Sequence, residues 1–233
     1  QPDLEHHRGE RERSLGRRFE TLDVPMRDLR RSGRAVGGSI NDALLAAVVG
    51  GVAAYHRGQN ATLDELRLTM PISFRSPGDP LGGNRFAPVR FTVPGDIADP
   101  AERIRVVGAM AHRWAREPFL DHTDTLALAL DRLPTSLTTA AFGGMLKHMD
   151  VVVTNVPGLP DTVYLSGAQV LSEYAFAPPT GAAANFSLLS MGDSACIGVV
   201  VDTAAIPEVA SLVRCLQESF EEVRAVGASA RGR

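Results

Sequence analysis

The longest stretch rich in apolar positions lies within residues 40–56. Ser39 and Asp42 stand three residues apart at its start, which is the spacing of a helix capping box. The predicted helix is apolar on every side, and such a helix lies between other layers of a protein. Gly50 and Gly51 would weaken the helix unless another backbone packs closely against them, so we expect a close contact there.

Further helices are predicted later in the chain. Asp99 and Pro100 form a strong helix start, with Glu102 completing a capping box. The segment 124–149 looks helical with a break at Pro134, and Pro207 begins a final amphipathic helix. The core face of the helix after Asp99 is expected to comprise Ile104, Val107, Ala111 and Trp114, and that of the final helix Val209, Leu212, Val213, Leu216, Phe220 and Val223.

Several segments have the period-two pattern or the β-branched runs of strands. They are residues 19–24, 66–73, 86–93, 151–154, 163–174, 185–191 and 195–202. Pro71 places the second of them near an edge or a strand end. Gly192-Asp193-Ser194 predicts a hairpin turn between the last two. The order of helices and strands predicts an α+β layered domain, a mixed β-sheet flanked by helices.

Composition bounds the class of protein. The chain has 233 residues, 44% hydrophobic and 22% charged, with a net charge of −3, so we expect a globular protein without a nucleic-acid footprint. Residues 1–18 are expected to be a charged linker and residues 228–233 a flexible tail. Because the chain begins at Gln1 and not at methionine, we expect it to be a piece of a longer protein.

Location is inferred from cysteine use and hydropathy. Cys196 and Cys215 make no disulfide framework, which fits a reducing cytosol. The alanine-rich segment 40–55 is too weakly hydrophobic to span a bilayer, and the charged N-terminus is no secretory signal. A cytoplasmic protein is expected.

Motif searches for catalytic groups find nothing complete. The histidines are scattered, no HExxH or His/Cys ligand spacing predicts a metal site, and GxSxG, P-loop and GxGxxG motifs are absent. His112 falls among the histidines placed at helix ends or surfaces.

Polar pairs at the ends of predicted elements have two explanations each. Asp42 is explained by capping and Asn41 by exposure in the first helical turn, or both line a cleft at the helix N-terminus. Thr154 and Asn155 follow a buried strand, where they form a plain exit into a turn or stand beside a substrate.

Other polar residues also have structural explanations. Asn185, Ser187 and Ser190 are explained by a polar solvent face. Arg75 and Asn84 flank the Gly/Pro-rich loop 77–84, where turn formation explains Asn84.

Several segments, by their order and spacing, match the motifs of a known family: Ser39-Ile40-Asn41-Asp42-Ala43-Leu44-Leu45-Ala46, Pro71-Ile72-Ser73-Phe74-Arg75, Gly83-Asn84, Val153-Thr154-Asn155-Val156-Pro157-Gly158, Tyr164-Leu165-Ser166-Gly167 and the hairpin 185–202. On these segments the chain, from about Phe19 to Val226, resembles the C-terminal half of the bacterial wax ester synthase/diacylglycerol acyltransferase (WS/DGAT) family. The resemblance implies one lobe, residues 19–227, of a two-lobed fold like chloramphenicol acetyltransferase and condensation-domain enzymes.

The family's catalytic HHxxxDG motif belongs to the N-terminal lobe and is absent here, since His6-His7 is followed by Arg8-Gly9-Glu10-Arg11-Glu12. The resemblance therefore implies a lobe that is inactive alone and that needs an N-terminal catalytic lobe as its partner. The implied reaction transfers an acyl group from acyl-CoA to diacylglycerol or a long-chain alcohol, with no cofactor.

The resemblance implies supporting or channel residues Asn41, Asp42, Thr154, Asn155 and Ser187, and substrate-binding or structural residues Arg75, Asn84, Pro157 and Gly158. Lipid substrates imply peripheral contact with a membrane or lipid droplet. Two alternatives stay open: a non-catalytic lipid-binding or interaction module, and a related acyltransferase that acts on a secondary-metabolite acceptor.

Overall fold

The computed structural model describes residues 13–73, 86–115, 149–159 and 161–230. The elements follow one another as β1 (Arg17–Pro25), α1 (Met26–Ala35), α2 (Ile40–Gly58), β2 (Glu65–Ser73), β3 (Phe86–Pro94), α3 (Pro100–Ala115), β4 (Val151–Val156), β5 (Tyr164–Leu165), β6 (Ala168–Gln169), β7 (Ala184–Met191), β8 (Ser194–Asp202) and α6 (Val209–Ser229). The helix expected at 124–149 lies almost wholly outside the described residues.

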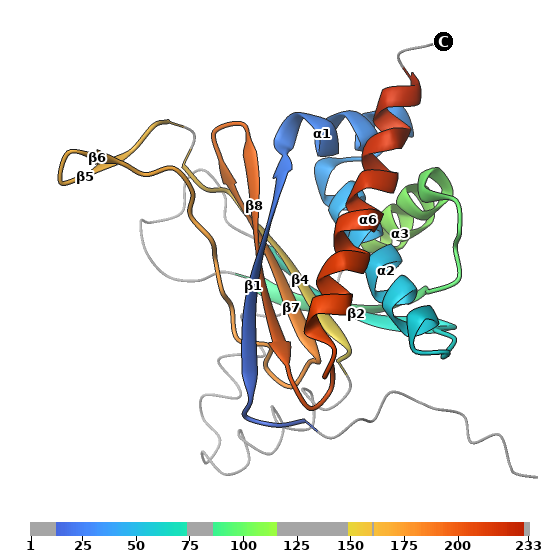
Figure 1. Cartoon of the computed structure of the whole chain (residues 1–233). Coiled ribbons are helices and arrows are strands. Elements are labelled where there is room, and N and C mark those ends of the chain that lie inside the picture. Colours follow the sequence, from blue (N-terminus) through green and yellow to red (C-terminus); the bar gives the residue numbers. More distant parts are fainter. Residues whose placement is uncertain (1–12, 74–85, 116–148, 160, 231–233) are drawn as a thin grey trace, which may run out of the picture.

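A mixed six-stranded sheet runs in the order β1-β8-β7-β4-β2-β3. Strands β2, β4 and β7 are parallel neighbours, and the remaining pairs are antiparallel. The described helices lie together on one face of this sheet, and the β5–β6 hairpin extends away from the other side (Figure 1). The predicted mixed sheet flanked by helices is therefore the arrangement that the structure has.

Helix α2 is the centre of the helical layer and packs against α1, α3 and α6. Its capping box is present as predicted, and it is buried on all sides from Asp42 to Ala53. A β-carbon at Gly51 would lie 2.9 Å from the Cα of Leu216 in α6. The close backbone contact expected at the two glycines is therefore confirmed for Gly51, whereas Gly50 makes room for the side chains of Arg103 and Ser219.

The other predicted elements are mostly placed as expected. The hairpin of β7 and β8 turns at Gly192, whose φ is +53°. Pro71 lies beyond the residues of β2 that pair with β4, near the end of the strand. Asp99 caps α3 by accepting a hydrogen bond from the N–H of Glu102 at 3.1 Å.

Two predictions at the helices need correction. Trp114 is 42% exposed and does not belong to the core face of α3. Helix α1 was not predicted, because its ten residues include four arginines and only two large apolar side chains, Met26 and Leu29. It is held by burial of Met26 and Leu29, and by an ion pair between buried Asp28 and Arg224 of α6.

The long strand expected at 163–174 is wrong. The segment contains only the short hairpin β5–β6, whose turn has Ser166 and Gly167 at positive φ. Strands β4 and β7 pair directly with each other, so the chain between them has no place in the main sheet. Beyond the hairpin the chain returns over the face opposite the helices. There the carbonyl oxygen of Ala175 lies so close to Gly198 that any side chain at position 198 would clash with it.

The first strand and the last helix extend slightly beyond the segments expected for them. Strand β1 starts at Arg17, two residues before 19, and α6 continues to Ser229. Ser14 is attached to the fold, because its N–H and its hydroxyl each donate a 2.8 Å hydrogen bond to Asp202.

Candidate functional site

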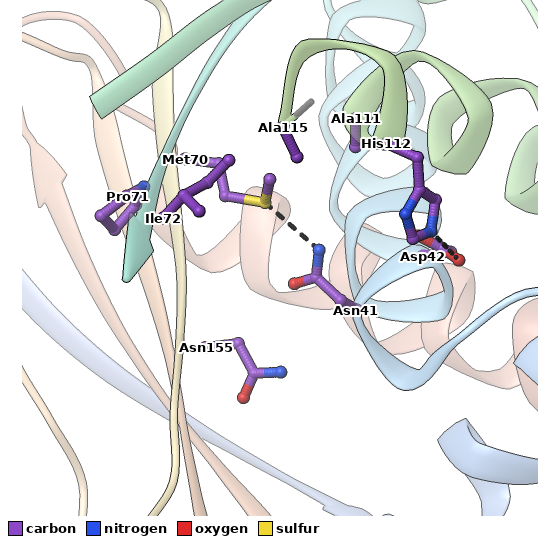
Figure 2. Close-up of a pocket in the computed structure, with 9 residues that line it drawn as sticks. All are labelled: Asn41, Asp42, Met70, Pro71, Ile72, Ala111, His112, Ala115 and Asn155. Atoms are coloured by element: carbon purple, nitrogen blue, oxygen red, sulfur yellow. Dashed lines mark hydrogen bonds and ion pairs between the residues drawn. The ribbon is translucent and has the colours of Figure 1, made fainter. Parts of the chain in front are cut away.

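A cavity of about 300 Å³ lies where the N-terminus of α2 meets the carboxyl ends of β2 and β4 and the last turns of α3 (Figure 2). The carboxyl ends of parallel strands are a common place for ligands in sheets with helices. The lining residues are Asn41 and Asp42 of α2, Met70, Pro71 and Ile72 of β2, Ala111, His112 and Ala115 of α3, and Asn155 of β4.

Asp42 both caps helix α2 and lines the cavity. Its Oδ2 accepts a 2.7 Å hydrogen bond from the N–H of Ser39, which closes the capping box. The same oxygen lies 3.1 Å from Nε2 of His112, and the carboxylate lines the cavity while only 2% exposed. Its Oδ1 is buried without a hydrogen-bond partner among the described residues. An unpaired buried carboxylate oxygen is costly, and this one lies in the close contact of α2 with α3 at Gly108, away from the oxygen that meets His112.

Two amides face the cavity from opposite sides. Asn41 reaches across it and donates from Nδ2 to the sulfur of Met70 at 3.2 Å, a weak hydrogen bond (Figure 2). The side chain of Asn155 points into the cavity from β4, and its amide makes no hydrogen bond within the described part of the chain. The amides and the imidazole can bind oxygen groups, while Met70, Ile72, Ala111 and Ala115 offer an apolar surface.

Thr154 and Ser187 do not join this cavity. Successive side chains of a strand point to opposite faces. Val153 belongs to the core under the helices, so Asn155 shares that face and Thr154 lies on the other one, beside its register partner Ser187. The expected polar pair Thr154-Asn155 is therefore divided by the sheet.

The polar solvent face expected on β7 is wrong. Asn185 and Ser187 are almost fully buried, and the hydroxyl of Ser187 donates to Oδ1 of Asn185 at 2.7 Å. Ser190 instead accepts a 2.9 Å hydrogen bond from the N–H of Gly158. These contacts are explained by the fold alone.

Gly158 and Pro157 shape the exit of β4. A β-carbon at Gly158 would lie 2.0 Å from the carbonyl oxygen of Ser190, so only glycine fits there. Pro157 is exposed. Arg75 and Asn84 lie outside the described residues, so their predicted roles stay predictions.

His112 is the residue of the cavity that sequence reasoning missed. It is separated from Asp42 by 70 positions, and no local spacing connects the two. The helices approach closely here because position 108 is glycine: a β-carbon at Gly108 would lie 2.7 Å from Cγ of Asp42. The small residues Gly108, Ala111 and Ala115 on one face of α3 were a signal of such an approach.

A second hollow of about 200 Å³ has a different chemistry. It is lined by Arg67, Thr69, Arg90 and Thr92 of β2 and β3, with Trp114 beside them. Arg67 forms a 2.7 Å ion pair with Asp150, and Nε of Arg90 is buried without a partner in the described part of the chain.

The described residues contain neither a cluster of metal-ligating side chains nor a single helix that could span a membrane. No group of three His, Cys, Asp or Glu side chains gathers there. No single described helix has the length and hydropathy to cross a bilayer; α1 and α2 meet the test only as a pair bent by 95°.

Comparison with known proteins identifies the family. The model of the WS/DGAT C-terminal domain matches residues 82–224. A putative diacylglycerol O-acyltransferase of Mycobacterium tuberculosis (strain ATCC 25618 / H37Rv) is 33% identical over 216 residues, which are 93% of this chain and 44% of that protein. The chain belongs to the WS/DGAT family, and it carries that family's C-terminal domain. It spans less than half the length of this curated relative.

Solved structures share the fold. The wax ester synthase/diacylglycerol acyltransferase from Marinobacter aquaeolei VT8 matches with a TM-score of 0.69 and 20% identity over 94% of this chain and 51% of that one. A structure of condensation-domain-mediated chain release from the enacyloxin polyketide synthase matches with a TM-score of 0.55 and 16% identity, over 89% and 41% of the two chains. The predicted fold class, a lobe of the chloramphenicol acetyltransferase-like type, is thereby confirmed.

Proposed function

We propose that this chain is the C-terminal lobe, residues 19–227, of an acyl-CoA-dependent O-acyltransferase that esterifies diacylglycerol or long-chain alcohols. Membership of the WS/DGAT family carries the proposal, because relatives matched over nine-tenths of this chain are named diacylglycerol O-acyltransferases. The cavity at α2 supports it, since it combines hydrogen-bonding groups with an apolar lining.

The reaction needs a base that this lobe is not expected to provide. A histidine of the N-terminal lobe takes the proton of the acceptor hydroxyl, and the oxygen attacks the thioester carbonyl carbon. The tetrahedral oxyanion collapses, the C–S bond breaks, and the CoA thiolate takes the proton from the imidazolium. The products are an ester and CoA, and no cofactor is consumed.

Asn41, Asp42 and Asn155 are the residues of this lobe that we place beside the reacting groups. The amides can donate hydrogen bonds to carbonyl oxygens of a substrate, and Met70 and Ile72 can contact its acyl chains. Thr154 and Ser187 lie on the other face of the sheet, so we assign them no role in this cavity.

The hairpin β5–β6 is the surface that we assign to the N-terminal lobe. Tyr164 and Leu165 are 63% and 73% exposed, and Leu171 just beyond is 82% exposed. Apolar side chains gathered on a projecting segment are typical of a protein–protein contact. The hairpin extends away from the body of this lobe, where a partner can reach it (Figure 1).

The test compares this chain alone with a protein in which it follows its N-terminal half. Release of CoA from palmitoyl-CoA is measured with 1,2-dioctanoylglycerol or hexadecanol as acceptor. We expect turnover by the two-lobed protein and none by the lobe alone. A two-lobed variant without the HHxxxDG histidines serves as the control and should be inactive. Full activity of the isolated chain would refute the assignment of the base to the other lobe.

A further inference from the structure

We infer that the cavity at the N-terminus of α2 binds the glycerol head of the acceptor, and that His112, held by Asp42, selects glycerides over plain long-chain alcohols. The inference rests on the proposed acyl transfer and names the acceptor class for which this lobe is built. His112 contacts the buried carboxylate of Asp42, and neither the fold nor the capping box requires this contact.

Asp42 fixes the orientation of the imidazole. A carboxylate only accepts hydrogen bonds, so Nε2 of His112 carries the proton in their 3.1 Å contact. The other ring nitrogen, Nδ1, then faces the side of the cavity on which Asn41 lies (Figure 2). A neutral ring accepts a hydrogen bond at Nδ1 from a hydroxyl, and a protonated ring donates one to an ester carbonyl. Partial glycerides carry such groups next to the reacting hydroxyl, whereas a plain alcohol has neither.

Several polar groups converge on the cavity. The amide of Asn155 makes no hydrogen bond among the described residues, and that of Asn41 has only the weak contact with Met70. His112, Asn41 and Asn155 can therefore each pair with a separate oxygen of one ligand. A ligand with several oxygens can pair with these groups together, whereas a ligand with one oxygen pairs with one of them at a time. Because the side chains of His112 and Asn155 stay partly open to water, we expect a moderate discrimination of about tenfold.

The charge of the cavity argues against the nucleotide end of CoA. The described lining contains no lysine or arginine, and its one acidic group is the buried Asp42. Phosphate groups would meet a carboxylate there without a guanidinium to pair with. A cavity of about 300 Å³ with Met70, Ile72 and Ala115 along its wall suits an uncharged head that continues into acyl chains.

The test uses the two-lobed protein with saturating palmitoyl-CoA and two acceptors, 1,2-dioctanoylglycerol and 1-decanol. For His112→Gln we expect kcat/KM for the glyceride to fall about tenfold, while kcat/KM for decanol stays within about twofold. Asn155→Ala should also lower the ratio of kcat/KM for the glyceride to kcat/KM for decanol. Because the side chain of Asn155 is exposed, we expect this variant to fold like the unmodified protein. Arg113→Gln, an exposed neighbour on α3, is the matched control and should change neither value.

An equal loss for both acceptors, or no loss for the glyceride, would overturn the inference. A second measurement separates this failure from that of the proposed function. The imidazole signals of His112 in the isolated chain are followed by NMR during titration with dioctanoylglycerol, decanol and CoA. Only the glyceride should move them, and His56, hydrogen-bonded to Val52 of its own helix, should not respond. If the two-lobed protein transfers no acyl group and these signals still respond, the acyltransferase proposal alone fails; if they do not respond, the inference fails.

Discussion

Among single residues, buried aspartates join segments that are far apart along the chain, as Asp28 does between α1 and Arg224 of α6. Asp42 connects the start of α2 with His112 of α3. Asp202, at the end of β8, accepts hydrogen bonds from Ser14 and Arg17 at the start of the lobe and from the N–H groups of the turn that follows it. Buried carboxylates are stable only when they are paired in this way.

Asp202 should therefore make the stability of the lobe depend on pH. Burial acts to raise the pKa of Asp202, but hydrogen bonds from the N–H and hydroxyl of Ser14 and from the N–H groups of Ala204 and Ala205 outweigh it, so the pKa is lowered. A lowered pKa contributes stability above the ordinary carboxyl value of about 3.9, and this stability is lost as the pH falls through the lower value in the folded state.

For Asp202→Asn we expect the free energy of unfolding at pH 7 to fall by about 1–3 kcal/mol, with a flatter decline below about pH 4 than in the unmodified chain. Urea unfolding followed by circular dichroism at pH 7, 5 and 3 measures both effects. Asp193→Asn, in the exposed β7–β8 turn, is the control and should follow the unmodified chain. Parallel pH curves for Asp202→Asn and the unmodified chain would contradict the prediction.

Among the elements, α2 determines how the helical layer packs and where the cavity lies. Its N-terminal turn supplies Asn41 and Asp42, and its middle contacts α6 through Gly51. Because α2 is buried on all sides, changes in its packing are transmitted to α1, α3 and α6 together.

A pair of glycine substitutions tests this packing. Gly51→Ala places a β-carbon 2.7 Å from Cδ2 and 2.9 Å from Cα of Leu216, so we expect a loss of about 1–3 kcal/mol in the free energy of unfolding. Gly58→Ala, at the last residue of α2, meets no atom within 4 Å and should be neutral or gain up to about 1 kcal/mol. Urea unfolding measures the free energy of unfolding of both variants. Equal values for Gly51→Ala and Gly58→Ala would refute the close packing of α2 on α6.

In the whole molecule, the sheet separates the helical layer from the segment that carries the β5–β6 hairpin (Figure 1). The described helices and the cavity lie on one face, and the segment that carries the β5–β6 hairpin leaves from the other side (Figure 1). On that opposite face the returning chain is attached by Tyr174, whose hydroxyl donates a 2.6 Å hydrogen bond to Asp23, and by a ring contact between Phe19 and Phe176. The base of the hairpin is therefore anchored while its tip stays exposed.

Replacing the apolar tip should separate binding of the partner lobe from folding. We expect Leu165→Ser to weaken association of separately expressed N-terminal and C-terminal halves about tenfold, with no change in the unfolding midpoint of this chain, because Leu165 is 73% exposed. Phe86→Ser, at an exposed apolar side chain of β3, is the matched control. Isothermal titration calorimetry measures both variants, and unchanged affinity for Leu165→Ser would remove the hairpin from the interface.

The sequence alone determined the features that depend on neighbours along the chain. The capping box of Ser39 and Asp42, the buried α2 helix, the cap at Asp99 and the β7–β8 hairpin follow from local hydrogen bonds and periodicity. The family could also be recognised, because the order of its motifs is a property of the sequence.

Tertiary structure decided what depends on distant partners. The contact of His112 with Asp42 joins two helices across 70 positions, and α1 is stabilised largely by side chains of other elements. The pairing of β4 with β7 excluded the segment 163–174 from the sheet and continued the strand to Val156. Because both residues are then within the strand, the side chains of Thr154 and Asn155 lie on opposite faces of the sheet. Local patterns show which element a residue can join, but the chemistry of the site depends on which faces meet, and that is set by the packing of the whole chain.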